Sequence, residues 1–388
     1  MPSPLLPLLA AALLGASTPD PGAGGGDGPA PAAGTASSEA PGAAAAHAGA
    51  AEAAALAPRG RSWFAFPVAF WLPETKLGLA AAAGVHFDVS QGAGDSNAFL
   101  VAGYTMLGQS TADVASDLSL KNGTLVTGRF RFAYYPDVFY GIGPSTTLDD
   151  REDVTRRFGE AIVTAELPVA HGLRLGPRVH GRVEEVLDVT EGGLLATGTV
   201  PGSDGFSALG LGLQATWDSR DHQLWPTRGG FAQLWYVRYP AGLAHGAEAF
   251  YRGAAEARLF VPLGKERVLG LAALLEHADA ATPFSIMPKI GSTRYLRGIR
   301  EGRFRDAIAW AGQAEVRVPF SRRFAATAFG ALGDVAPSLA AQRADTIKLA
   351  GGAGLRYRLT DRGANLRLDA ALSGEGGVEV YVLLLEAF

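Results

Sequence analysis

The chain has 388 residues, of which 48% are apolar and 51 are glycine, and its formal net charge is −4. It contains no run of eighteen apolar residues and no basic stripe, which excludes a helical membrane protein and argues against a nucleic-acid partner. The absence of cysteine excludes thiol catalysis, disulfide frameworks, thiolate metal sites and a lipid anchor on an N-terminal cysteine. On composition alone, a soluble enzyme is the simpler interpretation.

The beginning of the chain predicts an exported leader. Residues 5–16 form an apolar run of signal-peptide length, too short to span a bilayer, and small residues suit cleavage after Ser17. Residues 1–4 carry no Lys or Arg, so a low-complexity tail is the alternative. Residues 18–60 hold few large apolar side chains and cannot offset the entropy of ordering. The predicted domains are a signal peptide (1–17), a disordered leader (18–60) and a β-barrel (61–388).

From Trp63 onward, apolar and polar residues alternate with the period of two that is typical of β-strands. In one such run, Phe130 and Phe132 alternate with Arg129 and Arg131. The runs are about twice as long as the usual five or six residues of a globular strand, and a tilted strand of about ten residues crosses a bilayer. The sequence therefore predicts an all-β, antiparallel transmembrane barrel. A secreted soluble β enzyme is the alternative.

Sixteen strands are predicted, an even number, as in bacterial single-chain barrels. They are 62–72, 76–89, 96–108, 112–121, 124–135, 157–168, 172–186, 206–218, 228–238, 247–261, 266–277, 307–319, 323–333, 346–359, 364–373 and 376–387. The long connections (about 136–156, 187–205, 278–306 and 334–345) all follow odd-numbered strands. Long loops on one rim and tight turns on the other are typical of outer-membrane barrels, which predicts a location in the outer membrane of a Gram-negative bacterium.

The last predicted strand ends with an aromatic residue. Val382 and Leu384 lie on its apolar face, and Phe388 closes it. This ending is similar to the signal that outer-membrane assembly machinery recognises, so we expect that machinery as a partner during biogenesis. Glu386 is a departure, because the alternation puts it on the apolar face, at the rim of the bilayer.

Four stretches resemble the bacterial surface antigen family of outer-membrane barrels, the superfamily of BamA and TamA. They are PDVFYGIG at 136–143, DSRD and PTRG within 218–229, YLRGIREGRFRD at 295–306, and NLRLD at 365–369 with the EAF ending. The resemblance implies a short member that lacks periplasmic POTRA modules, because the residues before Trp63 are too few and of the wrong composition for one.

The third stretch is similar to the family's RG motif, on the loop between strands eleven and twelve. The motif residues here are Leu296, Arg297, Gly298 and Ile299. The resemblance implies that this loop folds into the lumen, where acidic residues of the inner wall hold the arginine. A guanidinium is always charged and can pin a loop to a carboxylate. Glu315 is the expected partner and Asp334 a second one, although the family's strand-thirteen aspartate is Ala331 here. A solvated loop is the alternative.

The sequence offers little for covalent chemistry. The aspartates at 149–150, 218 and 221 fit turns better than catalysis, the seven His have no metal-ligand spacing, and no nucleophile elbow, P-loop or zinc motif occurs. We expect no enzyme activity, no cofactor, no metal and no nucleic-acid partner. The resemblance implies insertion or translocation of client proteins, with outer-membrane lipid as the other partner. A passive or loop-gated pore, or a structural surface barrel, is the alternative.

Overall fold

The computed structural model describes residues 62–87, 96–359, 365–384 and 386. The predicted signal peptide (1–17), the leader (18–60) and Phe388 lie outside the described residues. Among the residues that are described, no helix has the length and apolar character needed to cross a membrane.

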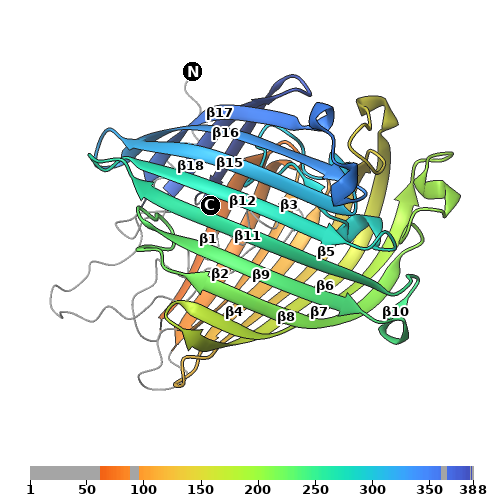
Figure 1. The fold of residues 1–388 in the computed structure, drawn as a ribbon, viewed down its shortest axis with the longest axis horizontal. Helices are drawn as coiled ribbons and strands as arrows, with labels where there is room; N and C mark the ends of the chain where they lie inside the picture. The colour runs from red at the N-terminus through yellow and green to blue at the C-terminus, as the bar shows by residue number, and fades with distance from the viewer. Residues whose placement is uncertain (1–61, 88–95, 360–364, 385, 387–388) are drawn as a thin grey trace. The chain divides into compact units, whose positions relative to one another are not determined.

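Sixteen long antiparallel strands close into one barrel wall (Figure 1). Their bounds are β1 Ser62–Leu72, β2 Lys76–Phe87, β3 Ser96–Thr105, β4 Ser110–Ser119, β5 Leu125–Phe139, β6 Glu152–Ala170, β7 Leu173–Val189, β8 Phe206–Asp218, β9 Gly229–Tyr239, β11 Phe250–Pro262, β12 Val268–Ala278, β15 Ile308–Pro319, β16 Phe324–Ala336, β17 Lys348–Arg358, β18 Asn365–Ser373 and β19 Val378–Leu384. Each long strand pairs with its neighbours in the chain, and β1 also meets β19. The predicted all-β, sixteen-stranded antiparallel fold is confirmed.

Three two-residue strands lie outside this series. β10 (Ala244–His245) pairs with β8 at the rim, and β13 (Lys289–Ile290) pairs with β14 (Phe304–Arg305) within the connection between β12 and β15. That connection, residues 279–307, is called the lumenal loop below.

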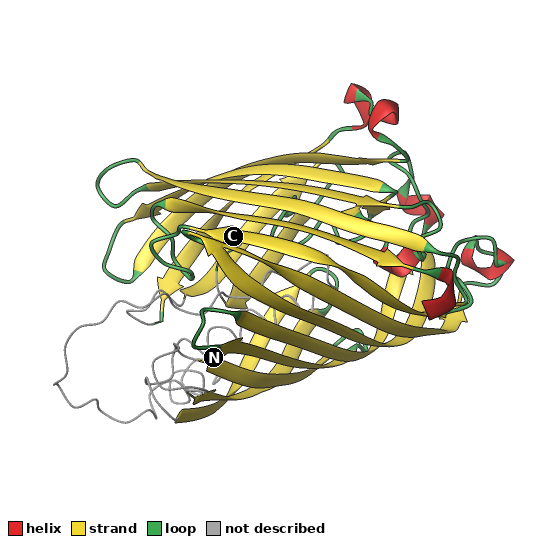
Figure 2. Cartoon of the chain, turned by 60° about the horizontal axis from the view of Figure 1, so that its bottom comes forward, coloured by secondary structure: helices red, strands yellow, loops and turns green. Residues whose placement is uncertain are grey.

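The long connections follow odd-numbered members of the sixteen-strand series, as predicted. Short 3₁₀ turns occur within them, and Figure 2 shows these turns gathered at one end of the barrel. They are η1 Leu148–Asp150, η2 Leu195–Thr197, η3 Ala241–Leu243, η4 Phe284–Ile286, η5 Leu339–Ala341 and η6 Ala344–Thr346. We call this end the long-loop rim and the opposite end the short-turn rim.

The strands β5, β6 and β7 are longer than predicted. The structure continues the β5–β6 pairing through Phe139 and Glu152, inside the predicted loop 136–156, and extends β7 to Val189. The alternation of apolar and polar residues marks the part of a strand that faces hydrocarbon. Backbone pairing continues past that part into polar sequence, so these boundaries were wrong.

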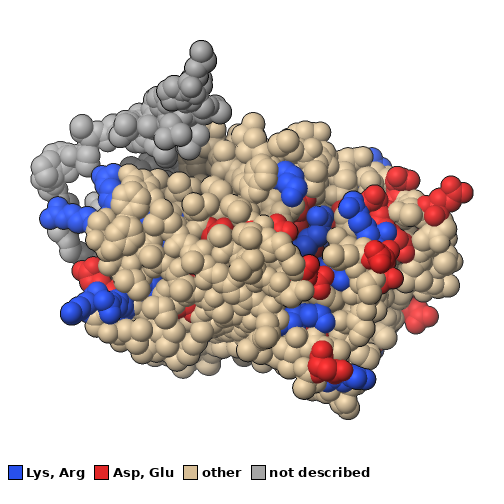
Figure 3. All heavy atoms as spheres, turned by 90° about the horizontal axis from the view of Figure 1, so that it is seen from above, with Lys and Arg blue, Asp and Glu red and all other residues tan. Residues whose placement is uncertain are grey.

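The two faces of the wall differ in chemistry. On β8, Leu209, Leu211 and Leu213 point outward, whereas Gln214 and Thr216 are buried on the lumenal side. The face drawn in Figure 3 has a mostly uncharged middle, with charged groups gathered toward the ends. An apolar outer band with ionic groups inside and at the rims is the arrangement that a bilayer requires.

Candidate functional site: the lumenal loop and its ionic anchor

The RG motif lies inside the barrel, fully enclosed by protein. The exposed fractions are 0% for Leu296 and Arg297 and 1% for Ile299. Leu296 and Ile299 belong to an apolar cluster that includes Ala311 and Val335 of the wall. Apolar packing therefore holds the loop in the lumen, and the solvated-loop alternative is excluded.

The backbone of the motif has a conformation that favours glycine. The φ angle of Gly298 is +103°, and a Cβ added there would lie 3.0 Å from backbone atoms of Leu372 on β18. Leu296 also has a positive φ of 49°, which is uncommon for a residue with a side chain. The tight backbone lets the loop approach the wall closely at this point.

Arg297 is held by two carboxylates of the lumenal wall. Its Nη2 donates to Glu315 Oε2 on β15 at 2.6 Å, and its Nη1 donates to Asp369 Oδ2 on β18, also at 2.6 Å. The guanidinium carbon lies 3.4 Å from the centre of the Phe329 ring. We call Arg297, Glu315 and Asp369 the ionic anchor. Its charges are paired and hydrogen-bonded, the condition under which buried charges are tolerated.

Further arginines neutralise the two carboxylates. Arg317 Nε donates to Glu315 Oε1 at 3.0 Å, and Arg356 Nη1 donates to Asp369 Oδ1 at 2.6 Å. Arg367 Nε donates to Asp369 Oδ2 at 2.6 Å. The anchor is thus the centre of a larger lumenal network, in which each carboxylate oxygen meets at least one cation.

The structure brings Arg297 and Glu315 together, as the sequence suggested, but it does not bring Asp334 to Arg297. Asp334 accepts a hydrogen bond from Thr346 Oγ1 at 2.5 Å, near the long-loop rim. The residue opposite Glu315 on β16 is Phe329, five positions before Asp334. Since a strand rises about 3.3 Å per residue, Asp334 lies too far along β16, and that prediction is corrected.

Asp369, the second carboxylate, was not predicted as a partner of Arg297, although it lies within the NLRLD stretch. Its alternation with Leu368 places it on the lumenal face, and that was the available signal. The sequence does not show that β18, four members of the series beyond β12, reaches the same loop residue.

The loop is also tied to β18 and β19. The Gly298 N–H donates to Tyr381 Oη on β19 at 2.8 Å, and the Gly298 carbonyl accepts from Ser373 Oγ on β18 at 2.7 Å. Arg303 Nε donates to Glu375 in the β18–β19 turn at 2.7 Å. These contacts fix the loop to the last hairpin of the barrel.

A further contact reaches the first hairpin. The Glu301 N–H donates to Glu74 Oε1, in the β1–β2 turn, at 2.9 Å. The Glu301 carboxylate lies 3.0 Å from Lys289 Nζ. Burial, reinforced by Glu74, raises the pKa of Glu301 to about 7 even though Lys289 opposes the shift. Burial also raises the pKa of Glu74. The lumenal loop therefore bridges the first and last hairpins through a titratable pair.

The first and last strands meet sparsely. Among the described residues, β1 and β19 pair at the single position Trp71↔Val382, whereas β1 and β2 pair at eleven positions and β18 and β19 at seven. We call the β1–β19 junction the seam. Leu384, the other described residue of the predicted assembly signal, pairs with Leu366 on β18.

Glu386 does not lie on the apolar face. Its carboxylate accepts hydrogen bonds from Arg356 Nε at 2.8 Å and Asn365 Nδ2 at 3.2 Å, inside the barrel. Because β19 ends at Leu384, the strand alternation no longer controls the direction of the Glu386 side chain. The prediction for this residue was wrong.

The network extends toward the short-turn rim. The Arg317 guanidinium lies 5.0 Å from the centre of the Trp225 ring, in the connection between β8 and β9. Asp221 shapes that connection by accepting the backbone N–H groups of Thr227 and Arg228, at 2.9 and 3.2 Å. This carboxylate has the turn-forming role that the sequence favoured.

Comparisons with known proteins agree with this architecture. The model of the Omp85 superfamily domain matches residues 187–376. The fold is similar to BamA from Haemophilus ducreyi lacking POTRA domains 1–3, with a TM-score of 0.59 and 12% identity over 84% of this chain and 70% of that chain. It is also similar to CdiB from Acinetobacter baumannii (TM-score 0.55, 10% identity, 83% of this chain and 59% of that one).

CdiB from Escherichia coli is a third similar structure, with a TM-score of 0.55 and 12% identity over 84% of this chain and 63% of that one. The chain therefore spans less than two thirds of either CdiB chain. No curated protein sequence matches it.

Proposed function

Because the chain carries an Omp85 superfamily domain in a closed sixteen-stranded barrel, we propose that it resides in the outer membrane and inserts client proteins into that membrane, or passes them across it, through the seam. Its partners would be membrane lipid, the client chains and, during its own biogenesis, the assembly machinery. Export would depend on the predicted signal peptide. The activity is not enzymatic, since no covalent bond is made or broken.

The observation that carries the proposal is the sparse pairing of the seam. Within a bilayer, backbone groups must be paired, and a net hydrogen bond contributes on the order of 1 kcal/mol. Opening a junction paired at one position costs far less than opening one paired at eleven. The two freed edges would each offer backbone donors and acceptors to an incoming strand, which is the principle of β-strand addition.

A disulfide across the seam tests this proposal. The chain has no cysteine, so Trp71→Cys combined with Val382→Cys introduces only the intended pair. Directly opposed residues in an antiparallel pair have Cα atoms about 4.5–5.5 Å apart, within the range of a disulfide. We expect the oxidised protein, reconstituted in liposomes, to lose its ability to speed the folding of an unfolded outer-membrane barrel, and reduction to restore it.

The matched control is Ala69→Cys with Leu79→Cys, a directly opposed pair on β1 and β2. Its disulfide should leave the activity unchanged, because that junction is not the one that opens. Equal activity of the oxidised and reduced seam variant would overturn the proposal.

Conductance in planar bilayers tests the alternative of a passive pore. The ionic anchor and the apolar part of the lumenal loop are buried inside the barrel. We therefore expect small, flickering currents. Large and steady currents would instead favour an open pore over an insertase.

A further inference from the structure

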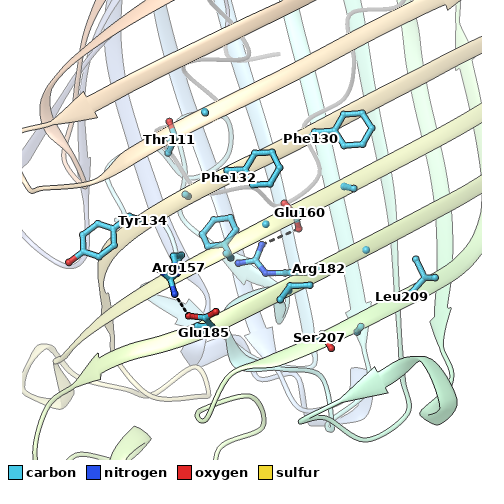
Figure 4. Close-up of a pocket in the computed structure, with 18 of the residues that line it drawn as sticks. Thr111, Phe130, Phe132, Tyr134, Arg157, Glu160, Arg182, Glu185, Ser207 and Leu209 are labelled. Atoms are coloured by element: carbon cyan, nitrogen blue, oxygen red, sulfur yellow. Dashed lines mark hydrogen bonds and ion pairs between the residues drawn. The ribbon is translucent and has the colours of Figure 1, made fainter.

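A trough lies on the outer, lipid-facing side of β4 to β8 (Figure 4). Its volume is about 970 Å³. The floor consists of Gly159, Ala161 and Gly181, whose side chains are absent or a single methyl group. Phe130 and Phe132 form one wall, and Val183 and Leu209 form the other. We call this feature the outer trough.

Strand register creates the trough in two successive rows across the wall. The first row pairs Phe132 with Gly159 and Gly159 with Val183. The second pairs Phe130 with Ala161, Ala161 with Gly181 and Gly181 with Leu209. In each row small residues lie between large apolar ones, so the depression runs along the strands.

The large side chains overhang the floor. The Phe132 ring lies 3.5 Å from the place where a Cβ on Gly159 would be, and a Leu209 methyl lies 3.6 Å from that place on Gly181. A larger residue at either glycine would therefore fill the space that the walls enclose.

An exposed ion pair lies at the end of the trough that is nearer the long-loop rim, one row beyond Phe132 and Gly159. Tyr134, Arg157 and Glu185 share this row. Arg157 Nη2 lies 2.5 Å from Glu185 Oε2, and these outward side chains are 62% and 56% exposed. Figure 4 shows the pair beside Tyr134, with the two phenylalanines farther along the wall.

This ion pair fixes the depth of the trough in the membrane. A charged side chain on the lipid face costs about 2–4 kcal/mol at the bilayer midplane and almost nothing at the interface. Tyrosine is also enriched at the level of the head groups. The row of Tyr134, Arg157 and Glu185 therefore lies at the interface. The two rows of the trough follow it toward the middle of the bilayer, among the acyl chains.

We propose that the outer trough binds one lipid with a phosphoethanolamine head group. One acyl chain would occupy the trough, the phosphate would meet Arg157, and the ammonium would meet Glu185. A guanidinium suits phosphate geometry, and a zwitterion lets both charges of the existing pair keep an opposite partner. A purely anionic head group would instead meet Glu185 as a like charge. This site rests on the proposed outer-membrane location, but it is independent of the seam and of the proposed insertase activity.

Native mass spectrometry of the detergent-purified protein tests the site with two probes, phosphatidylethanolamine and phosphatidylglycerol. We expect one phosphatidylethanolamine to be retained about tenfold more tightly than phosphatidylglycerol. Gly159→Leu with Gly181→Leu should weaken this retention at least tenfold. The control Ala255→Leu, an outward small residue on β11, should retain the lipid like the wild type. Heat-modifiable gel mobility checks that each barrel is folded.

A second variant probes the head group without changing the trough. Arg157→Gln with Glu185→Gln should abolish the preference for phosphatidylethanolamine over phosphatidylglycerol, while a lipid is still retained. Equal lipid retention by the wild type, by Gly159→Leu with Gly181→Leu and by Ala255→Leu would mean an adventitious lipid only. That result would overturn the proposal. A wild-type preference for phosphatidylglycerol would overturn the assignment of the head group.

Discussion

Arg297 carries a charge in a place with no access to solvent, so its two carboxylate contacts decide whether the lumenal loop stays in the lumen. Glu315 and Asp369 each accept one hydrogen bond from its fork at 2.6 Å. The sequence indicated the arginine and one partner, because a loop motif and a lumenal glutamate are both local patterns. It could not indicate the second partner, since that contact spans 72 positions of the chain.

Replacing Arg297 by Ala should loosen the loop without unfolding the barrel. Breaking a buried ion pair costs about 3–5 kcal/mol, and the lower value is expected here because Arg317 and Arg356 still neutralise the carboxylates. Protease cleavage in the loop should become at least tenfold faster, and bilayer conductance should rise. Arg343→Ala, which breaks an exposed pair with Asp345, is the control and should change neither. Wild-type behaviour of Arg297→Ala would contradict the role of the anchor.

Glu301 predicts a dependence of the loop on pH. Its pKa in the closed loop is about 7, above the ordinary value of 4.5, so the buried site favours the neutral carboxyl. Protonation of Glu301 therefore stabilises the loop in its lumenal position. This stabilisation is complete below pH 4.5, declines as the pH rises toward 7 and is lost above pH 7. The free energy involved is on the order of 3 kcal/mol. Lys289, Glu74, Asp137 and Arg305 are the charged groups that set this balance.

Hydrogen exchange of the loop amides between pH 5 and 8, corrected for intrinsic rates, measures this effect. Opening of the lumenal loop should increase with pH up to about 7 and then level off. Glu301→Gln should remain closed across the range, whereas Glu191→Gln, on an exposed part of the long-loop rim, should keep the wild-type profile. A wild-type profile that is flat would exclude Glu301 as the controlling group.

At the scale of strands, the sequence predicts the hydrocarbon-facing segments well and their polar extensions poorly. Period-two alternation requires one face in lipid and the other in the lumen, so it is lost beyond the bilayer, where no face meets lipid. The pairs Asp137↔Val154 and Phe139↔Glu152 lie in such a region, and Phe139 and Val154 are buried there against Phe284 of the lumenal loop. Only the geometry of the backbone shows that β5 and β6 continue there.

We expect these extensions to be as ordered as the membrane-spanning part. In the reconstituted protein, the amides of Val138 and Val154 should exchange slowly, because they lie within a continuous ladder. The amides of Glu191 and Gly192, in an exposed turn, should exchange rapidly and provide the comparison. Rapid exchange at Val138 and Val154 would mean that the ladder ends where the alternation does.

At the scale of the whole molecule, the fold was predictable because one constraint acts on the entire chain. Each strand must present apolar residues to lipid, and a closed wall must pair every backbone edge, so each strand carries the same alternating pattern and the strands can be counted from the sequence. The site was only partly predictable, since it depends on where a loop of the second half meets turns of the first, as Glu301 meets Glu74. No residue next to Glu74 or Glu301 in the sequence indicates that these two residues are in contact.

The order of assembly follows from where the lumenal loop is held. The ionic anchor draws only on residues 297, 315 and 369, all in the last quarter of the chain, and Arg367 Nη2 also donates to the Thr293 carbonyl at 2.5 Å. Because these contacts lie inside the finished barrel, we expect the carboxyl-terminal strands to wrap around the loop while β1 is still apart. In pulsed refolding into liposomes, we therefore expect protection of the loop from protease to precede formation of a 71–382 disulfide. The reverse order would show that the barrel closes first and that the lumenal loop enters the lumen afterwards.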